Sequence, residues 1–228
     1  MFVNDYPKCL THSHATIYAD DTSQDVSGKS IDTIEYKLKE DLVNSMQWMK
    51  RNKLTMNLKK TQCVLIGTKQ RLVKCRKICI EINNVILEIV DVAKLLGVNI
   101  DCSLSWSYHI DVLTKKISKK LGVLRRLKSF MSSFALLKVY NFVIFPHFNY
   151  CCTIWSGAQN AANIDKIFKL KKNAARIILN EQNDMTPSIV LFNKLKWMPM
   201  PDYFVYRKAI LVLKSLNQSI FNIIPIIL

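Results

Sequence analysis

Tyr18-Ala19-Asp20-Asp21 is the stretch that decides how this sequence is interpreted. A short apolar run, Ala15 to Tyr18, comes directly before two adjacent carboxylates. Because Asp favours tight turns, we expect Asp20 and Asp21 at the tip of a β-hairpin. The polar stretch Ser23 to Gly28 follows, so the pattern leaves open whether the second arm of this hairpin forms.

Two carboxylates at such a tip are suited to binding a divalent metal ion. Mg²⁺ and Mn²⁺ prefer hard oxygen ligands, and many enzymes of phosphoryl transfer hold two such ions about 3.5–4 Å apart. The pattern therefore nominates Asp20 and Asp21 as catalytic residues and metal ligands. The alternative is an ordinary surface turn with two hydrated acids.

Further motifs accompany this tetrapeptide along the chain. In chain order they are Phe2-Val3-Asn4-Asp5-Tyr6-Pro7, Trp48-Met49-Lys50-Arg51-Asn52-Lys53-Leu54, Asn57-Leu58-Lys59-Lys60-Thr61, Lys94-Leu95-Leu96-Gly97-Val98-Asn99-Ile100-Asp101, and Leu104-Ser105-Trp106 with His109-Ile110. Their order and spacing resemble the reverse transcriptase of non-LTR (LINE-type, jockey-like) retrotransposons. The resemblance covers nearly the whole chain, and the ordered set is far more specific than any single motif.

The resemblance implies the chemistry and the partners of the candidate site. It implies an RNA-directed DNA polymerase that copies element RNA from a DNA primer, with Mg²⁺ or Mn²⁺ as cofactor. Its partners would be an RNA template, a DNA primer, the RNA–DNA hybrid and deoxynucleoside triphosphates. By its place in the motif, Asp20 is the stronger metal-ligand candidate and Asp21 the weaker. Tyr18 and the small Ala19 would lie beside the primer end.

Two other motifs carry candidate residues by resemblance. Lys60 would approach the triphosphate and donate a proton to the leaving pyrophosphate; the alternative is an ordinary hydrated lysine. Leu96 and Gly97 match the strand that grips the primer, where a residue without a side chain permits close approach of the backbone. The alternative for Gly97 is a bulge or a turn.

The resemblance also implies that part of the enzyme lies outside this sequence. Such polymerases carry fingers, the first half of the palm and a further metal-binding aspartate upstream of the hairpin. We therefore expect a fragment, from a truncated element or a partial gene model, that is inactive alone. A second interpretation is a non-catalytic, nucleic-acid-binding remnant of a mobile element. A third is an untranslated or unfolded relic.

Composition narrows the class of protein. The 228 residues are half hydrophobic, which excludes disorder on grounds of composition. No apolar run approaches the roughly 20 residues of a membrane span, so no membrane is expected. Seven cysteines without framework spacing indicate a reducing, intracellular compartment, and the resemblance implies the nucleus. Zinc is not expected, because no paired Cys-x-x-Cys is present.

The net charge of +16 is concentrated in the second part of the chain. Residues 1–91 carry a balance of +3, whereas residues 92–228 carry +13. A basic half of this kind indicates a nucleic-acid partner; a basic surface without a partner and a membrane surface are the alternatives. The candidate contacts to the nucleic-acid backbone lie on one predicted helix and are Lys115, Lys116, Lys119, Lys120, Arg125 and Arg126.

Hydrophobic periodicity predicts an α+β fold in two regions. In the first region it predicts a helix over 31–53 with Ser30 as N-cap and strands over 62–66, 78–82, 85–89 and 95–100, with Asn83-Asn84 as a hairpin turn. In the second it predicts helices that start with Ser105 as N-cap, near residue 163, after Thr186-Pro187 and at Met200.

By resemblance, residues 1–100 are the C-terminal half of a polymerase palm, in which antiparallel strands with a covering helix carry the catalytic hairpin. Residues 101–228 would form a basic, all-helical thumb and connection.

Overall fold

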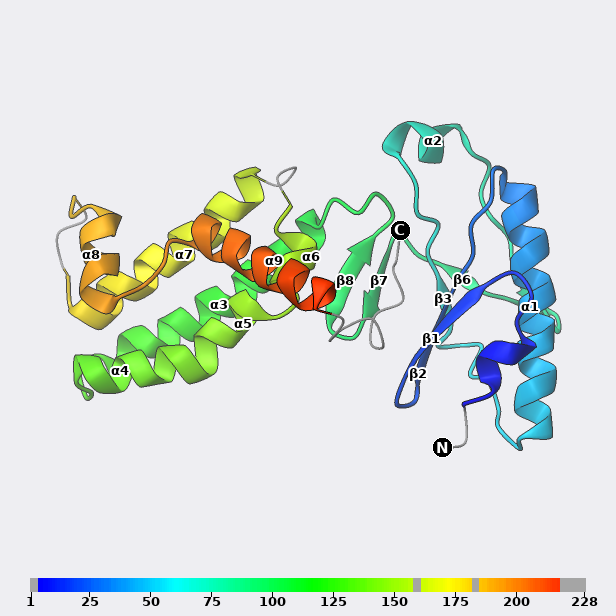
Figure 1. The fold of residues 1–228 in the computed structure, drawn as a ribbon, viewed down its shortest axis with the longest axis horizontal. Coiled ribbons are helices and arrows are strands. Elements are labelled where there is room, and N and C mark those ends of the chain that lie inside the picture. The colour runs from blue at the N-terminus through cyan, green and yellow to red at the C-terminus, as the bar shows by residue number, and fades with distance from the viewer. Residues whose placement is uncertain (1–3, 158–160, 182–184, 218–228) are drawn as a thin grey trace. The chain divides into compact units, whose positions relative to one another are not determined.

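The structure, a computed structural model, describes residues 4–157, 161–181 and 185–217 (Figure 1). Phe2 and Val3 of the first motif therefore lie outside the described residues, as do residues 158–160, 182–184 and 218–228 of the predicted thumb. The chain divides into two units, Met1–Leu95 with Ile100–Leu104, and Leu96–Asn99 with Ser105–Leu228. Whether these units are a palm and a thumb stays a prediction.

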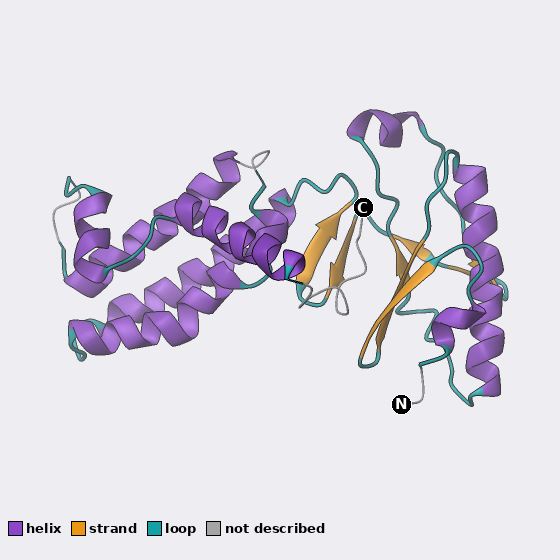
Figure 2. Cartoon of the chain, in the orientation of Figure 1, coloured by secondary structure: helices purple, strands orange, loops and turns teal. Residues whose placement is uncertain are grey.

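The first unit combines a hairpin, one long helix and several short strands (Figure 2). Its elements are η1 (Tyr6–Cys9), β1 (His14–Tyr18), β2 (Asp21–Asp25), α1 (Ile31–Arg51), β3 (Gln62–Cys63), α2 (Lys69–Lys74), β4 (Glu81–Ile82), β5 (Val85–Ile86), β6 (Glu88–Ile89) and β7 (Val92–Leu95). Helices together with small sheets agree with the predicted α+β class. Each sheet in the described part of the chain has two strands.

Helix α1 forms for the reasons that its sequence indicates. Ser30 caps it, because the Ser30 side chain accepts a hydrogen bond from the backbone N–H of Thr33. Its apolar residues, among them Leu38 and Leu42, pack in one cluster with Ile80 of the loop before β4. The apolar stripe thus covers the short strands, as predicted.

The strands of the first unit are shorter than the alternation predicts. The predicted strand 62–66 is reduced to β3, which pairs in parallel with β6, so the prediction of antiparallel strands is wrong for this pair. Asn83 and Asn84 have φ angles of 50° and 60° and turn the chain between β4 and β5, as predicted. Asn tolerates this left-handed conformation better than most residues.

The prediction of one continuous strand over 95–100 is wrong. Strand β7 ends at Leu95 and β8 (Val98–Asp101) pairs with it, so the motif forms a hairpin. Leu96 and Gly97 have φ angles of 46° and 84°. Two consecutive residues with positive φ make the tight turn that two-residue hairpins favour. The turn that was the alternative for Gly97 is therefore observed.

The second unit is helical after β8 (Figure 2). Its helices are α3 (Ser107–Leu127), α4 (Ser133–Val139), the π-helical segment η2 (Tyr140–Ile144), α5 (Phe145–Asn149), α6 (Cys152–Trp155), α7 (Ala161–Leu179), α8 (Ser188–Leu195) and α9 (Met200–Leu216). Ile117 of α3, Phe148 of α5 and Trp155 of α6 are each fully buried in its main apolar cluster.

Two predicted helix starts are shifted by one residue. The N-cap of α3 is Trp106, with a φ of 61°, and not Ser105. Pro187 and not Thr186 precedes α8 as its N-cap. In both places the backbone bends one position later than the side-chain pattern indicates.

Within the described residues, no helix is long and apolar enough to cross a membrane.

Candidate functional site

The hairpin of β1 and β2 has a loop of only two residues. Tyr18 pairs with Asp21 across the strands, which leaves Ala19 and Asp20 in the turn. Ala19 has a φ of 54°, a left-handed conformation that is unusual for alanine. The two acids are therefore not equivalent, because Asp20 lies in the turn and Asp21 is the first residue of β2. The polar second arm does form, since the backbone ladder does not depend on apolar side chains.

The two faces of this hairpin have different surroundings. Gln24 of β2 donates hydrogen bonds to Tyr6 Oη at 2.9 Å and to Ser45 Oγ at 2.8 Å, so its face is turned toward η1 and α1. Side chains alternate along a strand, which places Asp21 on the opposite face with its cross-strand partner Tyr18. Tyr18 is 66% exposed. The aromatic ring and the carboxylate thus share the open face of the hairpin.

A buried carboxylate that the sequence analysis missed anchors the base of the hairpin. Asp41 of α1 is fully buried. It accepts hydrogen bonds from the backbone N–H groups of Thr11, His12 and Ser13 at 2.7, 2.9 and 2.6 Å, and from the Ser13 hydroxyl at 2.6 Å. The segment that enters β1 is therefore fixed to α1.

The same hydrogen bonds explain the protonation state of Asp41. Burial by itself would raise the pKa of this carboxyl, but the donors from Ser13, Thr11 and His12 outweigh burial and hold the pKa below its ordinary value. Asp41 is thus ionised at neutral pH, where its charge is balanced by hydrogen-bond donors.

A signal for Asp41 was present in the sequence. Asp41 and Ser45 occur at the same helical spacing as Leu38 and Leu42, and all of them are buried on one face of α1. A carboxylate inside an apolar stripe is rare unless it is paired or hydrogen-bonded. The Ser45 hydroxyl also accepts a hydrogen bond from Tyr6 Oη at 3.1 Å, which extends the polar network.

The carboxylates of Asp20 and Asp21 are oxygen ligands of the kind that suits Mg²⁺. The side chains of Asp20 and Asp21 are exposed, and neither forms an ion pair or hydrogen bond with another described side chain. Mg²⁺ is commonly bound through one or two carboxylates, with water and substrate phosphates completing its shell. The described residues contain no group of three or more His, Cys, Asp or Glu side chains that would hold an ion alone.

The other residues predicted for the reaction lie elsewhere in the chain. Lys60 is exposed in the turn before β3, where its backbone N–H donates to Asn57 O at 3.0 Å. No described hydrogen bond or ion pair joins it to the hairpin. In the second unit, the carbonyl of Leu96 accepts a hydrogen bond from the Tyr150 hydroxyl, and a Cβ at Gly97 would meet the Tyr150 ring at 3.7 Å. The nucleotide and primer roles of these residues stay predictions.

The six basic residues of α3 do not form one row. From Ile110 to Leu124, a residue at every third or fourth position of α3 is buried against the core. Lys115, Lys119 and Arg126 lie on the side of the helix opposite this stripe and are exposed. Lys116 and Lys120 lie close enough to His147 to lower the pKa of its imidazole, after the larger effect of burial. The Arg125 guanidinium instead donates to Asn173 Oδ1 on α7 at 3.4 Å.

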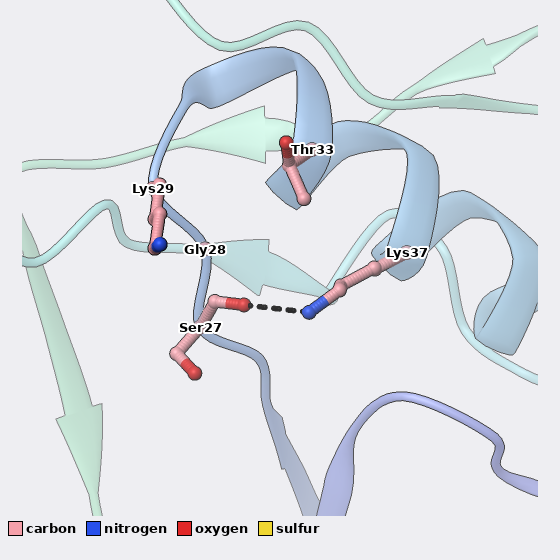
Figure 3. A pocket seen from close by; sticks show the side chains of 5 residues that line it. All are labelled: Ser27, Gly28, Lys29, Thr33 and Lys37. Atoms are coloured by element: carbon pink, nitrogen blue, oxygen red, sulfur yellow. Dashed lines mark hydrogen bonds between the residues drawn. The ribbon is translucent and has the colours of Figure 1, made fainter.

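A shallow hollow at the start of α1 is separate from these sites. Figure 3 shows its lining by Ser27, Gly28, Lys29, Thr33 and Lys37, with the Lys37 ammonium donating to Ser27 O at 3.2 Å. The helix terminus is already capped by Ser30, and neither Asp20 nor Asp21 lines the hollow.

Comparison with known proteins gives one informative similarity. The chain is 30% identical over 166 residues to the probable RNA-directed DNA polymerase from transposon BS of Drosophila melanogaster. The match covers 71% of this chain but only 18% of that protein. No family model and no solved structure matches the chain. A region of this chain is thus related to a transposon RNA-directed DNA polymerase.

Proposed function

We propose that the chain is the C-terminal portion of a non-LTR retrotransposon reverse transcriptase, comprising the second half of the palm and the thumb. The observation that carries this proposal is the exposed pair Asp20-Asp21 at a tight, anchored hairpin turn. The similarity to a transposon polymerase supports it independently. The reaction would be metal-assisted transfer of a nucleotide to the 3′-hydroxyl of a DNA primer on an RNA template.

In this proposal the hairpin residues hold and orient the reacting groups. Asp20 and Asp21 would hold Mg²⁺, or Mn²⁺ in its place, and such an ion would supply positive charge to stabilise the phosphate oxygens. Tyr18 shares the open face with Asp21 and would contact the primer end, which the small Ala19 leaves room to approach. Asp41 acts through the backbone, because it fixes the segment that leads into β1.

Lys60 and the β7–β8 turn complete the proposed set. Lys60 would lie near the triphosphate and protonate the leaving pyrophosphate. Leu96 and Gly97, which form the left-handed turn between β7 and β8, would contact the primer through their backbone.

The basic helix α3 would bind the backbone of the RNA–DNA hybrid. Its exposed charges, led by Lys115, Lys119 and Arg126, face away from the core. No described acidic side chain pairs with them, whereas Lys166 on α7 pairs with Asp111 at 2.8 Å. Free cations on one helix face suit contact with phosphates. The same charges also favour the second candidate function, a remnant that binds nucleic acid without catalysis. We place the working enzyme in the nucleus, where its DNA primer would be.

Paramagnetic Mn²⁺ distinguishes these two functions. Titration of the isotopically labelled chain with Mn²⁺ should broaden the amide signals of Ala19 to Thr22 first, because the ion would bind beside them. Asp20→Asn with Asp21→Asn should abolish this broadening, whereas Asp25→Asn at the far end of β2 should not. If the double variant shows the same broadening as the unaltered chain, the non-catalytic remnant is favoured.

A further inference from the structure

Lys171 of α7 is a buried cation without an acidic partner. The residue is only 3% exposed, and its ammonium donates a hydrogen bond to Met198 O at 2.7 Å. Its Nζ also lies 5.4 Å from the ring centre of Trp197, 5.7 Å from that of Phe145 and 5.8 Å from that of Tyr203. No described carboxylate forms an ion pair with it. Burial lowers the pKa of Lys171 to about 8, so the group is still mostly charged at neutral pH.

A second polar group in the same place lacks a partner. Tyr140, the first residue of η2, is 1% exposed, and its hydroxyl has no hydrogen-bond partner among the described residues. Its ring stacks on Trp197 with centres 4.3 Å apart. A buried hydroxyl without a partner is destabilising, and a buried ammonium with a single carbonyl partner is also poorly compensated. Both groups therefore have unused capacity to donate a hydrogen bond to an anionic acceptor.

Both groups line one pocket of about 340 Å³ within the second unit. The lining also includes Lys196, which is exposed, and Tyr206, which is 50% exposed. Among the described residues, no acidic side chain lines the pocket. Its interior therefore offers two hydrogen-bond donors, and its rim offers a second positive charge and an aromatic surface.

We propose that this pocket binds one nucleotide unit of a single-stranded nucleic acid. A phosphate oxygen would accept hydrogen bonds from the Lys171 ammonium and the Tyr140 hydroxyl, and Lys196 would add charge at the rim. An unpaired base would stack on Tyr206, since aromatic side chains bind unpaired bases regardless of sequence. The residues that line this pocket belong neither to the hairpin of β1 and β2 nor to the exposed face of α3, so the inference goes beyond the proposed function.

Fluorescence anisotropy of the purified full chain with a labelled dT12 strand tests this site. Lys171→Met should weaken binding at least tenfold, because a charged hydrogen bond contributes about 1.5–3 kcal/mol. Tyr140→Phe removes one oxygen and leaves the ring stack, and it should weaken binding about threefold or more. The matched control is Lys169→Met, which removes the same charge from an exposed position of α7 and should change affinity less than twofold.

Two further probes separate the ligand's parts. A 12-nucleotide abasic strand keeps the phosphates but should bind more weakly than dT12 because it cannot stack. Free thymidine monophosphate should compete with dT12 in the unaltered chain and not in Lys171→Met.

The outcome is decided by comparison among the variants. Unchanged dT12 affinity in both Lys171→Met and Tyr140→Phe would overturn the proposal, as would an equal loss in Lys169→Met. If Lys171→Met lowers the thermal midpoint of the chain, Tyr140→Phe alone decides. Loss of hybrid binding after substitutions on α3, with dT12 binding intact, would leave this site standing whatever the fate of the proposed polymerase function.

Discussion

The conformation of Ala19 is the most demanding one in the hairpin of β1 and β2. Its φ of 54° lies in the left-handed region, which costs a residue with a Cβ about 1–2 kcal/mol. Glycine avoids this cost but loses more freedom on folding. The net effect of Ala19→Gly should therefore be a gain of about 0.5–1 kcal/mol in the free energy of unfolding, measured with urea. Ala15→Gly, within β1, should lower stability by a similar amount. If both substitutions change stability equally and in the same direction, the left-handed conformation at Ala19 is contradicted.

Asp41 should make the stability of the chain sensitive to acid. Its pKa, and that of Glu35, which Arg76 and the backbone of Cys79 lower to about 2, lie below their ordinary values. Stability from such groups is complete above the unfolded pKa of about 4 and is lost as the pH falls through the folded value. Unfolding followed from pH 7 to 2 should show this loss.

Asp41→Asn should destabilise the chain by roughly 3 kcal/mol at pH 7, because it leaves buried donors poorly paired. It should also flatten the decline of stability in acid. A variant with the same acid dependence as the unaltered chain would show that Asp41 does not carry it.

Asp20 and Lys60 should differ in their importance once the polymerase is complete. Loss of a metal ligand removes charge stabilisation of the transition state, whereas a general acid contributes about 10²–10⁴-fold and water partly replaces it. Rates of primer extension by Asp20→Ala should therefore fall well below those of Lys60→Ala. Equal losses would mean that the lysine is as essential as the carboxylate.

At the scale of elements, α3 should bind a hybrid through the face opposite its buried stripe. Each phosphate contact contributes a slope of about −0.9 to the log–log dependence of affinity on salt. The triple variant with Lys115→Gln, Lys119→Gln and Arg126→Gln should therefore have a slope that is smaller in magnitude by about 2–3. Lys214→Gln is the control, since Lys214 is an exposed lysine of α9 and lies outside α3. If the triple variant keeps the slope of the unaltered chain, this face of α3 does not contact phosphates and is an ordinary hydrated surface.

The elements also show what the sequence allows one to predict. Helix α1 and its Ser30 cap follow from local pattern alone, because one helical stripe and one side-chain acceptor specify them. The β7–β8 hairpin was missed because Leu96 adopts a positive φ that leucine disfavours, so only contacts such as that of Tyr150 with its carbonyl stabilise the turn. The residues of the candidate site divide in the same way, into those that a local pattern predicts and those whose role depends on contacts distant in the sequence.

Asp20 and Asp21 were nominated by their motif, whereas the role of Asp41 depends on a segment that lies 28 to 30 residues away in the chain. From the sequence, Lys171 falls within the helix predicted to start near residue 163, and no local pattern marks it as buried. Lys171 is buried because the loop after α8 packs over it, and its ammonium donates a hydrogen bond to Met198 O in that loop.

At the scale of the whole molecule, the chain corresponds to a minor part of the relative that it matches, 18% of its length. A two-metal site needs more ligands than one pair of carboxylates. We therefore expect the purified chain with Mg²⁺ to give no primer extension on an RNA template. Extension above background that disappears in Asp20→Asn would contradict this expectation.

The most direct test of the central claim is a chimeric polymerase. In it, this chain replaces the matching segment of the transposon BS polymerase, and extension of a DNA primer on an RNA template is measured with Mg²⁺. We expect an active chimera whose rate falls at least about 10³-fold, equivalent to roughly 4 kcal/mol, with Asp20→Asn, and remains within a few fold with Asp25→Asn. An active chimera that tolerates Asp20→Asn would show that this hairpin is not the catalytic one.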